Sequence, residues 1–263
     1  MTHALIGATG FVGTTLRRQH AFDRLFASAN VDESRGASFD LAVCAGAPAQ
    51  KWIANREPQA DRANLERLAG NLRQIRCREF VLVSTVDVFA SPVGVDEDSA
   101  ASEEGLHAYG LHRRQLEQRV REIFPDALIV RLPGLVGPGL RKNVVYDLAH
   151  DNNLAAIDRR GVFQFYPTVN LWSDVTLALA RGLHLLHLTA APLSVADVSR
   201  EGFGREFGNE LASPPARYDM RSRHAALFGA TGAYQYSRRE SLIAIRAYAQ
   251  SEPRSPLAPS EPR

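Results

Sequence analysis

Three glycines near the start of the chain have the spacing of a phosphate-binding turn. They lie in the stretch GATGFVG (7–13), which follows a short apolar run and precedes a stretch compatible with a helix. Gly7 permits a tight turn, Gly10 lets the backbone approach a pyrophosphate, and Gly13 lets the helix pack on the strand. The helix N-terminus then offers unpaired N–H groups to the phosphates. The sequence therefore predicts dinucleotide binding by Gly7, Thr9, Gly10, Phe11, Val12 and Gly13.

The end of the second expected strand bears on the choice between NAD and NADP. That strand ends as FASAN (26–30), and no acidic residue stands at its end to bond a ribose 2′-OH. Ser28, Asn30 and Arg35 together could hold a 2′-phosphate, whereas Asp32 could equally reach a free hydroxyl. We lean slightly to NADP, because Arg35 is close by.

Short apolar runs that alternate with helical patterns must position these residues. The runs lie at 4–6, 25–27, 41–43, 80–83, 128–130 and 193–195, and helical patterns cover 58–75 and 107–124. Near-continuous apolar runs suit strands that are buried on both faces. The alternation predicts an α/β fold with a Rossmann-type, doubly wound parallel sheet.

The second half of the chain has a different pattern. We expect a helix at 143–150, a strand at 162–166, a helix after Asp174 and a helix that Ser237 and Glu240 open as a capping box. Residues 205–236 match no pattern that we can assign. We therefore divide the chain into a dinucleotide-binding core (1–133), a mixed segment with a small substrate lobe and the last sheet elements (134–250), and a Pro- and Ser-rich tail expected to be disordered (251–263).

Composition narrows the class of protein. The 263 residues are 45% apolar and 23% charged, with a net charge of +2, so nothing points to a nucleic-acid or membrane partner. Cys44 and Cys77 have no metal-like neighbours and predict neither a metal site nor a disulfide framework. No apolar stretch is long enough for a transmembrane helix, and an early first strand leaves no room for a signal peptide. We expect a soluble cytoplasmic protein.

Six further stretches, in order, resemble one family together with the glycine turn. They are CAGAP (44–48), PQADRAN (58–64), STVDVF (84–89), YGLHR (109–113), RLPGLVGPG (131–139) and LWSDV (171–175). This pattern is similar to the extended short-chain dehydrogenase/reductase family of nucleotide-sugar epimerases, dehydratases and ketoreductases. The resemblance implies that Ala45, Gly46, Asn64, Arg113 and Pro133 lie beside the cofactor, with Asn64 on a helix behind the active site.

The resemblance also implies an acid–base pair. Hydride transfer between a nicotinamide and a sugar carbon needs a partner proton transfer, and a tyrosine suits it if positive charge lowers its pKa from about 10. By the match, Tyr109 is the acid/base and the hydroxyl of Thr85 orients the substrate oxygen.

One departure from the family pattern concerns the residue four positions after the tyrosine. The family usually has lysine there, and this chain has Arg113, which shares a helix face with Tyr109. A guanidinium can lower the pKa of the tyrosine and bond the nicotinamide ribose, but it cannot relay a proton because it does not deprotonate. His112 lies about 100° round the helix, so we expect it at the surface.

A second departure lies at the end of the fourth strand. Dehydratases of the family carry an acidic pair where this chain has Val86 and Asp87. Because elimination of water needs two groups, dehydration is disfavoured against reduction or epimerisation. Asp87 either contacts a sugar hydroxyl or caps the next turn.

The expected substrate is a nucleoside-diphosphate sugar bound under the small lobe. Candidate partners for its diphosphate are Arg141, Lys142, Arg159, Arg160, Arg221 and Arg223. The leading hypothesis is an NAD(P)-dependent oxidoreductase or epimerase that reduces or epimerises a 4-keto sugar, active as a possible homodimer. The alternative is a catalytically weak NAD(P)-binding sensor or assembly protein on the same fold, which Arg113 and the short lobe favour.

Overall fold

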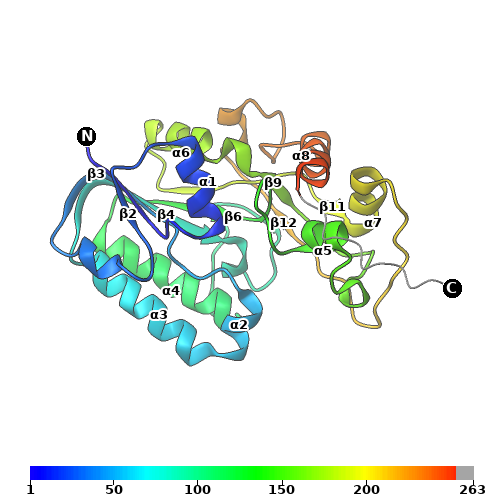
Figure 1. Ribbon diagram of the computed structural model, residues 1–263, viewed down its shortest axis with the longest axis horizontal. Coiled ribbons are helices and arrows are strands. Elements are labelled where there is room, and N and C mark those ends of the chain that lie inside the picture. Colours follow the sequence, from blue (N-terminus) through cyan, green and yellow to red (C-terminus); the bar gives the residue numbers. More distant parts are fainter. Residues whose placement is uncertain (253–263) are drawn as a thin grey trace, which may run out of the picture.

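A six-stranded parallel sheet forms the centre of the molecule. The computed structural model describes residues 1–252, and Figure 1 shows them with the sheet beside a smaller lobe. The strands are β1 (His3–Ile6), β2 (Arg24–Phe26), β3 (Ser38–Cys44), β4 (Arg76–Thr85), β6 (Leu128–Leu132) and β10 (Leu185–His187), in the spatial order β2-β1-β3-β4-β6-β10. The predicted Rossmann-type α/β fold is confirmed. The strand order reverses between β1 and β3, which is where such sheets bind ligands.

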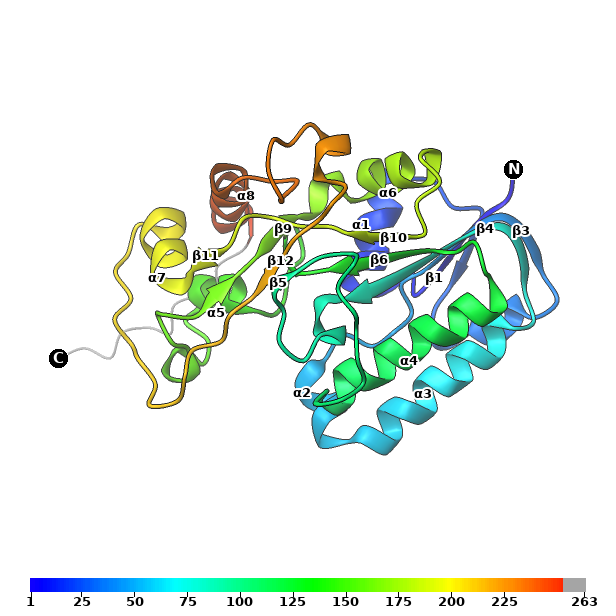
Figure 2. The same cartoon turned by 180° about the vertical axis from the view of Figure 1, so that it is seen from behind.

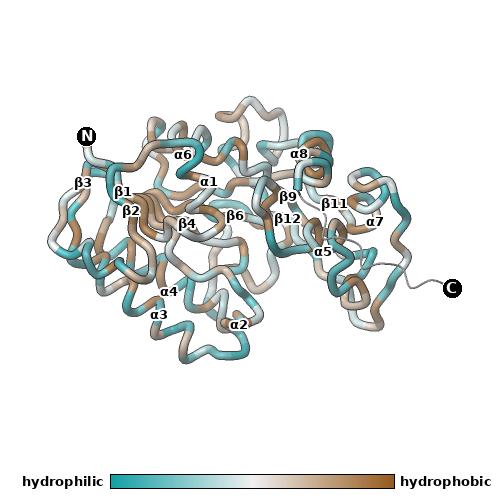
Figure 3. The backbone as a smooth tube through the Cα atoms, in the orientation of Figure 1, coloured by the Kyte–Doolittle hydropathy of each residue, from teal (hydrophilic) through white to brown (hydrophobic). Residues whose placement is uncertain are grey.

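Helices cover both faces of this sheet (Figures 1 and 2). One face carries α3 (Pro58–Leu72) and α4 (Ala108–Ile123), against which α2 (Lys51–Arg56) packs; the other carries α1 (Phe11–Gln19) and α6 (Leu171–Ala180). Successive strand residues point to opposite faces. Ala4 and Ile6 accordingly join the core under α3 and α4, whereas Leu5 joins the core under α1 and α6. Figure 3 shows the apolar strands enclosed by helices with hydrophilic outer turns.

The small lobe is built mainly from the chain after β6, with β5 added from the segment between β4 and α4. Its helices are α5 (Val144–His150), α7 (Val195–Asp197) and α8 (Arg238–Ser251). Its strands pair in twos: β5 (Val93–Val95) with β12 (Asp219–Met220), β7 (Gly134–Val136) with β9 (Phe165–Pro167), and β8 (Val162–Phe163) with β11 (Leu193–Ser194). Short 3-10 turns lie at Val31–Ser34 (η1), Val86–Val88 (η2), Leu154–Ala156 (η3), Thr168–Asn170 (η4) and Ala225–Phe228 (η6), and a π turn at Val198–Gly202 (η5). The lobe has its own apolar core.

Several element predictions need correction. The sixth strand of the sheet is β10, whereas the run at 193–195 supplies β11 in the lobe. The single strand predicted at 162–166 is two strands separated by Gln164, and α6 begins at Leu171, before Asp174. The capping box at Ser237 and Glu240 is confirmed. Helix α8 runs to Ser251 with Glu252 as its C-cap, and residues 253–263 of the predicted tail lie outside the described residues.

Candidate active site

The glycine turn has the backbone geometry that a phosphate cradle requires. Gly7 has φ +86°, and a Cβ there would collide with the carbonyl of Ala45, so β3 and the turn are in direct contact. A Cβ on Gly13 would collide with the carbonyl of Gly7. At Gly10 the nearest atom to an added Cβ is 3.6 Å away. The first and third glycines are thus required by the fold, whereas a Cβ on the second would meet no close contact within the protein.

The N-terminus of α1 fits the charge of a dinucleotide. Gly10 is the N-cap and supplies no side-chain hydrogen bond, and the first turn of α1 contains no acidic residue. The first backbone N–H groups of the helix are therefore available to an anion, which the helix dipole also favours. Thr9 and Gly10 are exposed. These features fit the pyrophosphate of NAD or NADP.

At the end of β2, two predicted cofactor residues already have partners within the protein. The Asn30 amide accepts a hydrogen bond from the N–H of Ala27 at 2.7 Å and donates to the carbonyl of Leu25. Asp32 accepts from Arg35 at 2.9 Å and from Arg67 at 2.6 Å. Because two guanidiniums already bond Asp32, its carboxylate is poorly suited to bind a ribose hydroxyl. Arg35 and Arg67 also bring positive charge that a phosphate could bind.

The structure brings Thr85, Asp87 and Tyr109 together at the carboxyl edge of the sheet. Thr85 is the last residue of β4, and its hydroxyl accepts from the N–H of Asp87 at 3.2 Å. Helix α4 begins directly against this strand end, because a Cβ on Gly110 would collide with the carbonyl of Asp87. The Asn55 side chain of α2 accepts from the N–H of Tyr109 at 2.9 Å. Three segments thus fix the position of Tyr109.

The surroundings of Tyr109 act on its acidity in opposite directions. Burial raises its pKa, since only 8% of the residue is exposed, and the Asp87 carboxylate adds to the rise. Arg113, a hydrogen bond with Thr85 and the charge of Lys51 all lower the pKa, and the balance lies above the usual value. The hydroxyl therefore stays protonated in the free protein, as a proton donor must.

Groups of the protein itself hold the Arg113 guanidinium. It forms a two-pronged ion pair with Asp61 of α3, with N–O distances of 2.5 and 2.8 Å. It also donates to the carbonyls of Pro48 and Tyr109, at 2.5 and 3.2 Å. Of the three side-chain nitrogens of Arg113, only the buried Nε has no acceptor among residues 1–252. The guanidinium lies 3.9 Å from the centroid of the Tyr109 ring, so it contributes charge to the ring face.

The prediction that His112 lies at the surface is wrong. His112 is buried, and its Nδ1 lies 2.7 Å from Asp61. Asn64 is exposed on α3. Asp61, one turn earlier, takes the inward position. Burial raises its pKa, but hydrogen bonds from Arg113 and His112 hold the pKa below the ordinary value.

Lys51 and Tyr218 are site residues that the sequence analysis missed. The Lys51 ammonium donates to Asp87 at 2.7 Å and to the Tyr218 hydroxyl at 3.2 Å, and Tyr218 lies 3.1 Å from the same Asp87 oxygen. Burial lowers the pKa of Lys51, but Asp87 and Tyr218 outweigh it, and the pKa is raised. Tyr218 lies in the unassigned stretch 205–236. A usable signal for Lys51 was its rarity, since Lys51 and Lys142 are the only lysines among 31 basic residues.

Four of the six residues predicted to bind the diphosphate have partners within the protein, and the other two, Arg141 and Arg159, are exposed. Arg160, Arg221 and Arg223 each form an ion pair with a nearby acid: Asp158, Asp219 and Asp98, respectively. Lys142 donates to the carbonyl of Ala49, beside Lys51. Burial and the Arg113 charge lower the pKa of Lys142. Pro133 is buried between β6 and β7.

A buried ion pair fixes α4 to the sheet beneath the site. Glu117 is fully buried and accepts from Arg131 at 2.7 and 3.0 Å and from the Ser84 hydroxyl at 2.6 Å. Such a pair holds its elements in one arrangement because either charge alone would be costly to bury. Tyr109 therefore sits on a helix with a fixed register against β4.

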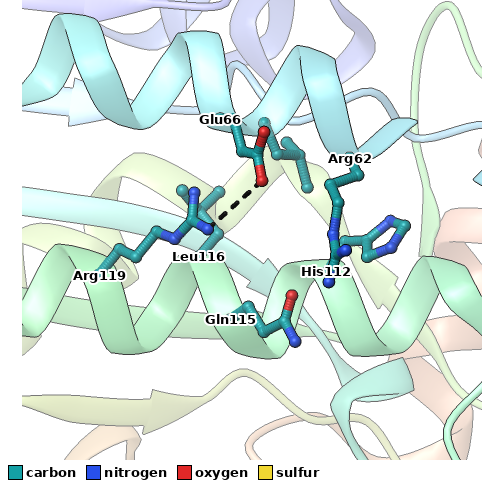
Figure 4. A pocket seen from close by; sticks show the side chains of 7 residues that line it. Arg62, Glu66, His112, Gln115, Leu116 and Arg119 are labelled. Carbon is teal, nitrogen blue, oxygen red and sulfur yellow. Dashed lines mark ion pairs between the residues drawn. The ribbon is translucent and has the colours of Figure 1, made fainter. Parts of the chain in front are cut away.

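A small depression between α3 and α4 lies on the outer side of these helices (Figure 4). Arg62, Glu66, His112, Gln115, Leu116 and Arg119 line it with Leu65, and an ion pair of 3.6 Å joins Arg119 to Glu66. Most of its polar groups are ordinary surface residues, and we assign it no function. Over residues 1–252, no helix is both long and apolar enough to cross a membrane. No group of three potential metal ligands occurs in the same range.

The fold and the glycine turn define a Rossmann-type α/β protein, and solved structures of that architecture are similar to this chain. A dTDP-4-dehydrorhamnose reductase from Bacillus anthracis in complex with NADP is 17% identical with a TM-score of 0.71, over 96% of this chain and 100% of the other. The corresponding reductase from Clostridium acetobutylicum is 17% identical with a TM-score of 0.69, over 95% of this chain and 99% of the other. A UDP-glucuronic acid 4-epimerase from Bacillus cereus in complex with NAD is 13% identical with a TM-score of 0.69, over 95% of this chain and 99% of the other. At these identities the likeness establishes the fold.

Neither a protein-family model nor a curated protein sequence matches the chain. The residues of the site therefore have to be argued from their own geometry.

Proposed function

We propose that this protein is an NAD(P)-dependent reductase or epimerase of the extended short-chain dehydrogenase/reductase type, acting on a nucleoside-diphosphate sugar. The observation that carries the proposal is the meeting of Thr85, Asp87 and Tyr109 where the end of β4 contacts the start of α4, at the carboxyl edge of a Rossmann sheet that also carries the glycine turn. The solved structures of similar fold include reductases and epimerases of nucleotide sugars crystallised with NADP or NAD, which supports the same class here.

The chain's own residues divide the work. The α1 N-terminus and Gly10 bind the pyrophosphate, Ala45 and Gly46 line the neighbouring strand end, and the cofactor supplies or accepts a hydride. Thr85 orients the substrate oxygen, and the Tyr109 hydroxyl gives that oxygen its proton in the reductive direction. Arg113 lowers the pKa of Tyr109 through the ring face without reaching the reacting atoms. We also propose that residues 1–133 bind the cofactor, that the lobe within residues 134–250 binds the substrate, and that the protein forms a homodimer.

The direct test is an assay with reduced cofactor and a panel of 4-keto nucleotide sugars. Loss of nicotinamide absorbance in the presence of one sugar, and none without sugar, is the expected result. A panel without turnover, together with tight cofactor binding, would favour the alternative of a catalytically weak sensor. The locked Arg113–Asp61 pair is the observation that favours that alternative.

A further inference from the structure

The site lacks the lysine that its chemistry needs at the usual helix position. Arg113 stands there, its guanidinium is held by Asp61 and by two backbone carbonyls, and it does not deprotonate in proteins. A tyrosine that gives up its proton in each turnover must recover one. Arg113 cannot return it, so the proton comes from another side chain or from water.

The only two lysines of the chain lie close to this site. Lys51 opens α2 and bonds Asp87, and Lys142 reaches from the lobe to the carbonyl of Ala49, two residues before Lys51. All other basic side chains that can carry a permanent charge are arginines. Lysine differs from arginine in that its ammonium can release a proton, so this placement points to proton chemistry rather than to charge alone.

Helix α2 carries both Lys51 and a hydrogen-bond partner of Tyr109. Lys51 and Asn55 are four residues apart, so their side chains lie on one helix face. Asn55 accepts from the backbone N–H of Tyr109, which fixes that face of α2 against the start of α4. Asp87 lies between the two, since its carboxylate holds Lys51 and its backbone packs against Gly110.

We propose that Lys51, carried by α2, is the residue that returns the proton to Tyr109, in place of the lysine that α4 lacks. This inference rests on the proposed function. In the reductive direction the O–H bond of Tyr109 breaks as a new O–H bond forms on the substrate oxygen. The phenolate then takes a proton from the Lys51 ammonium, and the neutral amine regains one from water. Asp87 and Tyr218 position Lys51, which has three N–H donors and uses two for them.

The charged and titratable groups around Tyr109 define what a pH experiment would report. Arg113 lies over its ring, Asp87 and Lys51 lie at the strand end, His107 precedes it on α4 with ring centroids 6.2 Å apart, and Tyr218 approaches from the lobe. Burial and the Lys51 charge lower the pKa of His107. A change assigned to Lys51 must therefore be separated from changes at Arg113 and His107.

The first experiment needs no substrate. The ionisation of Tyr109 is measured as the difference in tyrosine absorbance between a protein and its Tyr109→Phe counterpart across alkaline pH. Lys51→Met is expected to raise this pKa because the cation is lost, and Lys51→Arg is expected to leave it nearly unchanged. His107→Gln and Arg113→Met are measured beside them. An unchanged Tyr109 pKa in Lys51→Met would overturn the proposal, whatever the protein turns over.

The second experiment separates proton transfer from charge. With an identified sugar, Lys51→Met and Lys51→Arg are both expected to lose turnover by about 100-fold, because neither side chain can return a proton. In Lys51→Ala, small primary amines are expected to restore turnover and guanidinium salt is not. Amines are expected not to rescue Lys142→Ala. Wild-type turnover in Lys51→Arg would overturn the relay and leave the proposed function standing. If no sugar is turned over, the proposed function fails and the relay fails with it.

Discussion

The carboxylate of Asp61 and the guanidinium of Arg113 form a buried, two-pronged ion pair that joins α3 to α4 directly behind Tyr109. The side chains are 5% and 3% exposed, so neither charge has water as an alternative partner. The ion pair therefore gives Arg113, which stands four residues after Tyr109, a structural role between the two helices. Its contribution to stability can be measured without substrate or cofactor.

Asp61→Asn is expected to destabilise the fold by about 3–5 kcal/mol, because Arg113 is left buried without a counter-charge. The effect depends on pH. The folded pKa of Asp61 lies below its ordinary value, so the stabilisation is present above the unfolded pKa and is lost as pH falls through the folded one. Urea unfolding of both proteins between about pH 6 and pH 3 measures this. A constant difference in unfolding free energy would contradict the role of Asp61.

Gly10→Ala and Gly13→Ala form a matched pair of variants. The added methyl group makes an ordinary van der Waals contact with the Gly7 carbonyl at Gly10, 3.6 Å away, and collides with that carbonyl at Gly13. Gly10→Ala should therefore keep the thermal midpoint and lose cofactor affinity, since the methyl group occupies the phosphate approach. Gly13→Ala should instead lower the midpoint by several degrees. Calorimetric titration and thermal unfolding distinguish the two, and unchanged cofactor affinity in a folded Gly10→Ala would argue against binding at this turn.

Arg35→Ala is expected to weaken NADP binding by about tenfold or more and to leave NAD binding nearly unchanged, because a charge-assisted bond to the 2′-phosphate would be lost. Arg200→Ala, which removes an exposed arginine on the lobe, is the control. Dissociation constants for both cofactors decide the matter. Equal losses for NAD and NADP would show that Arg35 acts on the fold, and a preference of the wild type for NAD would refute the lean to NADP.

Tyr109→Phe keeps the ring that Arg113 lies over and removes only the hydroxyl. Cofactor affinity and the thermal midpoint should survive, while turnover falls on the order of 100-fold or more. Steady-state kinetics with the sugar found by the panel is the measurement. Should the variant turn over at the wild-type rate, Tyr109 is a structural residue, and Asp87 becomes the next candidate for the acid.

Local signals in the sequence predicted most of the sheet and the glycine turn, because apolar runs and glycine spacing act through neighbouring residues. Strand β10 was not predicted because His187 interrupts its apolar pattern. That histidine is fully buried, burial lowers its pKa to about 4, and Glu97 accepts from its backbone N–H at 2.8 Å. A polar residue in a core strand depends on partners far along the chain, and no local pattern reveals them.

The same reason explains the errors at the site. Helical spacing placed Arg113 correctly on the face of Tyr109 but gave no sign that Asp61 would hold it, or that His112 would face inward, since both depend on how α3 lies along α4. Lys51 and Tyr218 meet at Asp87 from segments 167 residues apart. Family resemblance pointed to Asn64 and gave no signal for either of these two residues.

The contact between Gly110 and the carbonyl of Asp87 has a consequence for how a ligand enters. It joins the end of β4 to the start of α4 without an intervening side chain, so Thr85, Asp87 and Tyr109 keep a fixed spacing. Tyr218 reaches Asp87 and Lys51 from the lobe through two hydrogen bonds at its hydroxyl. The residues after it also bond to the segment between β4 and α4, because β12 pairs with β5 and Glu97 accepts from Ser222 and Arg223. A ligand therefore enters a site whose reacting hydroxyls are spaced before it binds.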